Sequence, residues 1–90
     1  MKKAIISVLG KDRVGIISSV SSILSENNVN ILDISQTILQ DVFTMMMLVD
    51  VAEAKIKFAD LADNLAEVGK NLGVEIRIQL EDIFQAMHRI

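Results

Sequence analysis

The chain has 90 residues, the length of a single domain. Its 9 Lys and Arg against 12 Asp and Glu give a net charge of −3, and an acidic chain neutralises nucleic-acid phosphates poorly, so no nucleic-acid partner is expected. The absence of Cys excludes disulfide scaffolds, thiol chemistry and cysteine-based metal sites, and three Phe are the only aromatic residues.

Apolar residues make up 51% of the chain, at the upper edge of the roughly 45–50% usual in globular domains. A small domain needs much of its sequence for its surface, so we expect either a dense core or an apolar surface buried against another chain. No apolar run reaches the ~18 residues of a membrane span, and no membrane partner is expected. Residues 1–10 lack a signal-peptidase motif, so they are interpreted as a strand of a cytoplasmic protein.

The first elements in chain order are a strand over residues 2–9, a loop over Gly10–Arg13 and a helix over residues 14–27. Asp12 is predicted to cap the helix and the Asn27-Asn28 pair to end it, because Asn tolerates the left-handed conformation common at helix ends. Serines lie on one face of this helix, opposite an apolar face defined by spacings of three and four residues. The apolar face consists of Val14, Ile16, Ile17, Val20, Ile23 and Leu24.

The rest of the chain is predicted to form two strands joined by a turn, a second helix, a last strand and a short C-terminal helix. The turn sequence, Gln40-Asp41, is not one favoured in tight two-residue hairpins, so we expect a longer loop or a bulge there. Gly73 follows the second helix where a C-terminal glycine belongs, and Gly69 is expected to permit close packing. These elements span residues 29–39, 42–51, 55–72, 74–80 and 81–90.

This order of elements, with right-handed crossovers and short connections, leaves one common architecture. We therefore predict a single α+β domain over residues 1–90, with the ferredoxin-like βαββαβ fold. Four antiparallel strands form one layer, two helices cover one face of it, and a short helix over about residues 81–90 follows.

Apolar residues occupy both faces of the predicted sheet, whereas a sheet with one solvated face alternates apolar and polar residues. In the first strand Ile5 and Leu9 face opposite to the other apolar residues, and in the third strand Met46 and Leu48 do the same, so both sides of the sheet centre are expected to be buried. The adjacent methionines 45–47 alternate between the faces, so they suit core filling rather than one thioether metal site. A second subunit is the favoured cover for the face without helices, a C-terminal segment folded back over it is the alternative, and the two can coexist.

The segment Gly10–Gly15 (GKDRVG) joins the first strand to the first helix and is one candidate binding site. The unpaired N–H groups and the dipole at a helix N-terminus attract carboxylates and phosphates, and Lys11 and Arg13 add positive charge. An ordinary strand-to-helix turn with solvated basic side chains explains the same residues. The spacing matches neither the dinucleotide-binding motif nor the P-loop, and no cofactor is expected.

Asn30, at the start of the second strand, is the other candidate, because an amide can donate to a carboxylate and accept from an ammonium. We expect it beside the Gly10–Gly15 loop, and the alternative is an Asn that bonds the local backbone. Asp33 is interpreted as a solvated charge that protects the sheet edge. His88 has no Cys or second His with which to hold a metal, so a surface position and no metal site are expected.

The sequence GKDRVGI, followed by an amphipathic helix and VNILDIS, resembles the ACT domain, a small regulatory module that binds amino acids. The resemblance covers residues 2–81. The hairpin QTILQDVFTMMMLVD and the tail IFQAMHRI are similar to free-standing ACT proteins of the UPF0237 group, which are related to the ACT domains of glycine-cleavage-system repressors. The resemblance to the ACT domain implies a domain that pairs with a copy of itself, most simply as a dimer, and holds an amino acid at the interface.

The resemblance also implies the residues of the site. The N–H groups of Val14 and Gly15 would take the ligand carboxylate, and the amide of Asn30 would orient its polar end. Val14 stands where many ACT domains have Pro, and some ACT domains bind no ligand and only assemble. The loop residues carried over are Asp12, Arg13, Val14 and Gly15.

A non-enzymatic, small-molecule-sensing regulatory domain is therefore the expected function, and a ligand-free interaction module that regulates a partner protein is the alternative. Acylphosphatases share the topology and hold phosphate with an Arg and an Asn, which invites comparison with Arg13 and Asn30. Their phosphate-cradling loop is absent from this sequence, and no base is positioned for catalysis, so enzymatic activity is not expected. RNA recognition on this topology requires aromatic residues on the central strands, where Phe43 stands alone.

Overall fold

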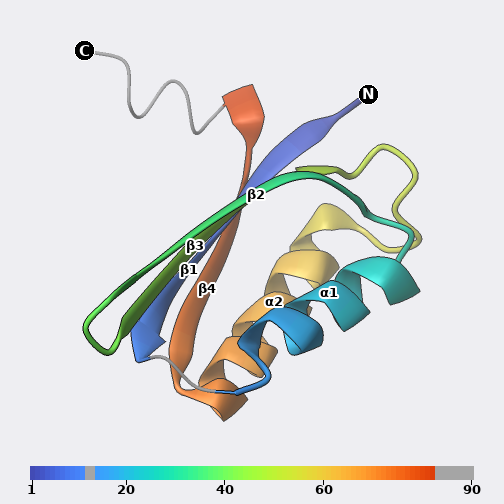
Figure 1. Ribbon diagram of the computed structural model, residues 1–90. Coiled ribbons are helices and arrows are strands. Elements are labelled where there is room, and N and C mark those ends of the chain that lie inside the picture. The colour runs from blue at the N-terminus through green and yellow to red at the C-terminus, as the bar shows by residue number, and fades with distance from the viewer. Residues whose placement is uncertain (12–13, 83–90) are drawn as a thin grey trace.

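The computed structural model describes residues 1–11 and 14–82 of the chain. It has two layers, a four-stranded sheet and two helices that cover one face of it (Figure 1). This order of elements confirms the predicted fold, and residues 83–90 of the predicted C-terminal helix lie outside the described part. None of the helices within the described ranges is long and apolar enough to cross a membrane. The elements are β1 (Lys3–Lys11), α1 (Ile16–Glu26), β2 (Asn30–Leu39), β3 (Val42–Asp50), α2 (Phe58–Leu72) and β4 (Val74–Leu80).

The strands lie in the order β2-β3-β1-β4, and every neighbouring pair is antiparallel. β1 and β3 are therefore the central strands, and β2 and β4 form the edges. Lys3 pairs with Asp50, and Asp50 pairs with Asn30, so these three residues form one row at one end of the sheet. The observed fold therefore belongs to the predicted α+β class and has the predicted ferredoxin-like arrangement.

The core lies between the sheet and the helices, and the strands contribute to it with every second side chain. Met45 and Met47 are fully buried there, whereas Met46 is 37% exposed on the opposite face. This confirms the predicted alternation, because successive side chains of a strand point to opposite faces. A Cβ added to Gly69 of α2 would lie 2.7 Å from the carbonyl oxygen of Val74, so the predicted close packing is also confirmed.

The helix α1 begins two residues later than predicted. Its N-cap is Gly15, whose φ of 95° is accessible to glycine at little cost. Val14 consequently precedes the helix and is 97% exposed, so its predicted place on the apolar helical face is wrong. The N-cap position also falls on Gly15 rather than on Asp12, which is outside the described residues.

The β2–β3 hairpin differs from the prediction at its turn. Leu39 pairs directly with Val42, so Gln40 and Asp41 form a two-residue connection rather than a longer loop. Gln40 has a φ of 58° and takes the left-handed conformation that such a turn requires, although it is not Gly or Asn. A register irregularity is present at the other end of β2, between Ile31 and Asp33.

The edge strand β2 is exposed along all ten of its residues. By register, Ile31, Ile34 and Ile38 lie on the helix side of the sheet, because they pair with buried residues of β3. Their side chains are nevertheless 37%, 44% and 51% exposed, so the two helices do not cover this part of the sheet. The structure thus leaves an apolar strip uncovered beneath β2.

Candidate functional site

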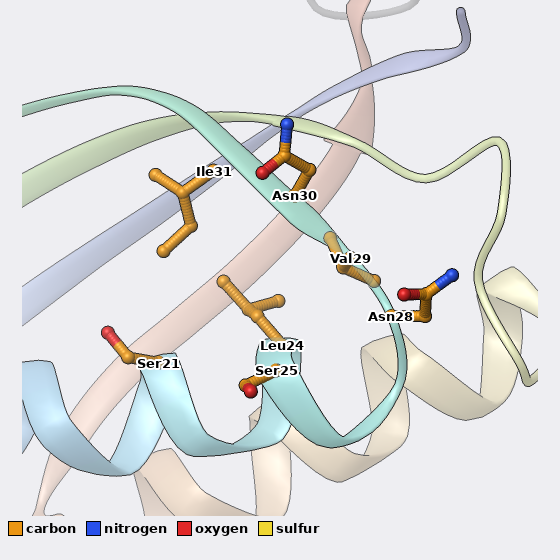
Figure 2. A pocket seen from close by; sticks show the side chains of 7 residues that line it. All are labelled: Ser21, Leu24, Ser25, Asn28, Val29, Asn30 and Ile31. Carbon is orange, nitrogen blue, oxygen red and sulfur yellow. The ribbon is translucent and has the colours of Figure 1, made fainter.

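An open hollow of about 430 Å³ lies between the C-terminal half of α1 and the start of β2. Its volume falls within the range of roughly 300–1,000 Å³ that small-ligand sites occupy. Figure 2 shows Leu24 and Ile31 directed towards one another across the hollow, one from the helix and one from the strand. The lining residues are Ser21, Leu24, Ser25, Asn28, Val29, Asn30 and Ile31.

The turn between α1 and β2 is rigidly hydrogen-bonded. The Asn28 N–H donates to the Ser25 carbonyl at 3.2 Å and the Val29 N–H to the Leu24 carbonyl at 2.8 Å, the pairing of a Schellman helix end. Asn28 has a φ of 59°, as the predicted left-handed helix stop requires. Its side-chain amide donates to the Glu53 carbonyl at 3.1 Å, so Asn28 supports the wall of the hollow and its amide is already engaged.

The polar side chains around the hollow are the hydroxyls of Ser21 and Ser25 and, at its rim, the amide of Asn30. Among the described residues, none of these three side chains has a hydrogen-bond partner. Figure 2 shows the Asn30 amide on the side of β2 that faces away from α1, at the rim of the hollow. Within the described part of the chain no ionisable side chain lines it, so these residues offer neutral hydrogen-bonding groups and an apolar floor.

The other predicted site residues lie at the opposite end of the sheet. Gly15 follows the end of β1 at Lys11, whereas Asn30 shares a row with Lys3 at the start of β1. Eight residues of strand separate these two ends, a distance of about 26 Å at ~3.3 Å per residue. The expectation that Asn30 lies beside the loop is therefore wrong within one chain, because the helix α1 carries the chain back along the sheet before β2 begins.

The N-terminus of α1 has free backbone donors. No side chain of the described residues caps it, and its first turn holds no acidic residue. The Gly15 carbonyl is engaged by the Ser19 N–H at 3.0 Å and the Ser18 hydroxyl at 3.3 Å. The remaining N–H groups lie at the positive end of the helix dipole, which is the chemistry expected for holding a carboxylate. Asp12 and Arg13 lie outside the described residues.

Two residues of the hollow were not singled out by sequence reasoning as binding residues. Ser21 and Ser25 belong to the serine face of α1, which the sequence places opposite the apolar face of this helix. Their spacing of four residues places them side by side on the helix surface, and this spacing is the feature of the sequence that could have identified them as a pair. Only the position of β2 shows that this face borders a hollow.

This arrangement of sheet, loop and first helix belongs to a known class of protein. The family model of the ACT domain matches residues 2–89, and the chain belongs to the ACT domain family, whose members are generally small-molecule-binding regulatory domains. More narrowly, it falls among the UPF0237 proteins: it is 52% identical to the UPF0237 protein of Methanocaldococcus jannaschii over the full length of both chains.

Solved structures agree with this assignment. An ACT domain protein from Streptococcus pneumoniae has a TM-score of 0.79 and 44% identity, over 92% of this chain and 93% of that one. A putative glycine cleavage system transcriptional repressor has a TM-score of 0.76 at 20% identity, with 88% of this chain matching 45% of that one. At that identity the second likeness concerns the fold alone.

Proposed function

We propose that the protein is a non-enzymatic regulatory domain that binds an amino acid or a related metabolite between two copies of the chain. The observation that carries this proposal is that the two candidate binding groups, the N-terminus of α1 at Gly15 and the amide of Asn30, lie at opposite ends of one sheet. A small ligand cannot contact both within one chain. It can contact both if a second copy lies beside the first in the reverse direction.

The exposed edge of β2 supplies a surface for such pairing. Leu39 and Val42 flank a two-residue turn, so they form a hydrogen-bonded pair. Because hydrogen-bonded pairs alternate along an antiparallel ladder, every second residue of β2, counted back from Leu39, directs its N–H and C=O groups towards β3. Ile34, Gln36 and Ile38 then direct theirs outwards. The bonding of the Ile34 N–H agrees with this assignment, because this group donates to the Asp33 carboxylate at 2.8 Å.

Antiparallel pairing of two β2 strands about Gln36 satisfies these outward groups. Each Ile34 then faces Ile38 of the partner subunit across the new strand pair, on the helix side of the sheet. Ile17 of α1 is 38% exposed and lies four residues before Ser21, on the same face of the helix. The pairing would remove the apolar strip beneath β2 from water and place the serine faces of the two α1 helices near one another.

The reversed direction of the partner also completes the ligand site. Asn30 and the hollow of one copy come to the end of the paired sheet where the partner carries its loop and helix N-terminus. The free N–H groups after Gly15 of the partner subunit suit the carboxylate of an amino acid. Ser21, Ser25 and Asn30 suit its ammonium and polar groups, and the apolar floor at Leu24 and Ile31 accommodates a side chain.

Thermal unfolding in the presence of each of the twenty amino acids tests this function. A ligand at about 100 times its Kd adds about 2.7 kcal/mol to the free energy of unfolding, and each kcal/mol moves Tm by roughly 4–8 °C in a domain of this size. We expect one or a few amino acids to raise Tm. Asn30→Ala should abolish that shift while leaving the circular dichroism spectrum unchanged.

The matched control is Asn64→Ala, which removes an exposed amide from the outer surface of α2 and should retain the ligand response. Equal ligand responses of wild type and Asn30→Ala would remove Asn30 from the site. No response of the wild type to any amino acid would favour the second candidate, a ligand-free interaction module. The exposed apolar residues on both sides of the sheet support that candidate.

A further inference from the structure

The face of the sheet that points away from the helices carries a second apolar surface, here called the open face. Its apolar side chains extend from the hairpin end across β3 and β1. Small hydroxyl side chains lie beside them on the same face. The outer positions are charged, which is the arrangement of an interface with an apolar core and a polar rim. The apolar residues are Ile5, Leu9, Leu39, Val42, Met46 and Leu48.

We propose that two β2-paired dimers stack through their open faces and form a tetramer. This inference rests on the dimer of the proposed function, because the stacked surface is the continuous eight-stranded sheet that β2 pairing creates. The occupant of the open face is thus the same face of a second dimer. Sheets that pack face to face stand about 10 Å apart with interdigitating side chains, and the Ser and Thr neighbours of Met46 leave room for that approach.

The area of the open face favours a dimer as the stacking unit. Four strands at ~4.8 Å spacing and about 27 Å in length present roughly 500 Å². A stable interface buries about 800 Å² per partner, so the sheet of one chain is too small. The paired sheet of two chains presents roughly 1,000 Å², which exceeds that requirement.

The charges of the open face permit self-association although the chain carries a net charge of −3. Register assigns three basic and three acidic side chains to this face, so it is balanced. Glu75 and Arg77 of β4 also form an ion pair with one another, in which Arg77 Nε donates to Glu75 Oε1 at 2.8 Å. The excess negative charge therefore belongs to other surfaces. The six residues are Lys3, Lys11 and Arg77 against Asp33, Asp50 and Glu75.

Sedimentation equilibrium of the full chain tests the proposal. We expect the mass of four chains for the wild type and of two chains for Met46→Glu, because stacking would bury that carboxylate without a partner. Ala59→Glu adds the same charge at an exposed position of α2 and should remain tetrameric. Circular dichroism of both variants shows whether each remains folded, and Leu9→Lys is the second open-face variant should Met46→Glu not fold.

The possible results separate this inference from the proposed function. A wild-type dimer that Met46→Glu leaves dimeric would overturn the stacking and leave the proposed function intact. A wild-type dimer that becomes monomeric on Met46→Glu would place the dimer interface on the open face and overturn both. If Met46→Glu lowers Tm without changing the mass, the chain itself covers the open face, and the stacking is again overturned.

Discussion

Gly69 lies where α2 packs most tightly against the sheet. A Cβ at this position would approach the Val74 carbonyl oxygen to 2.7 Å and Ile76 Cγ1 to 3.0 Å. Backbone atoms of β4 cannot move aside as the end of a flexible side chain can, so the absence of a side chain at Gly69 sets the distance between helix and strand. The residue is buried and helical, and it has no positive φ, so packing rather than backbone conformation requires glycine.

Gly69→Ala should therefore lower the free energy of unfolding by about 1–3 kcal/mol, the usual cost of overpacking. Helix propensity alone predicts a gain of about 1 kcal/mol, because Ala is the better helix former, so the sign of the change identifies the cause. Urea unfolding followed by circular dichroism measures it, with Asn71→Ala at an exposed position of the same helix as the control. A stabilised Gly69→Ala would contradict the close packing.

At the scale of elements, β2 is the strand whose surroundings within one chain are incomplete. All ten residues are exposed, and its outer edge offers the backbone groups of Ile34, Gln36 and Ile38. Such an edge is a template for pairing with another chain unless it is protected. Asp33 provides partial protection through its bond to the Ile34 N–H, but that bond leaves the Gln36 and Ile38 groups open to a partner.

Gln36→Pro should break the pairing of two copies while preserving the fold. Its N–H faces outwards, so proline removes a donor that only a second copy would use, and proline is tolerated at such edge positions. Ser35→Pro is the contrasting variant, because the Ser35 N–H faces β3 and its loss should unfold the hairpin. The measurement is molar mass by light scattering together with circular dichroism. An unfolded Gln36→Pro beside a folded Ser35→Pro would show that the assignment of edge groups is reversed.

At the scale of the whole molecule, assembly should contribute to stability. The isolated chain leaves apolar side chains exposed beneath β2 and on the open face, and association would remove them from water. Stability that depends on association rises with protein concentration by mass action.

We therefore expect the wild-type Tm to rise over a hundredfold increase in protein concentration, because each tenfold step adds about 1.4 kcal/mol per association event. Differential scanning calorimetry gives the measurement. Gln36→Pro serves as the control, since its Tm should be independent of concentration. A concentration-independent Tm of the wild type would mean that the folded chain does not depend on a partner.

Features that depend on neighbouring residues along the chain were predictable from the sequence. The strand β4 (Val74–Leu80) has the predicted bounds, because alternation of apolar and polar residues is a local signal with a period of two. Gly73 ends α2 with a φ of 75°, and Asn28 has a positive φ in the turn after α1. Both positions were predictable because Gly and Asn are the residues that most readily adopt the left-handed conformation at helix ends. The order of elements and the limited set of connections between them then determine the fold.

Only the tertiary structure decided the features that depend on position in space. Gln40 accepts a positive φ because the strands on both sides of it are already paired, and that constraint outweighs local preference. The helix-side residues of β1, β3 and β4 are buried beneath the helices, whereas those of β2 are exposed, because burial depends on where the helices lie over the sheet and not on the local sequence pattern. The same geometry places Asn30 and Gly15 at opposite ends of the sheet, a separation set by the direction in which α1 runs between two strands.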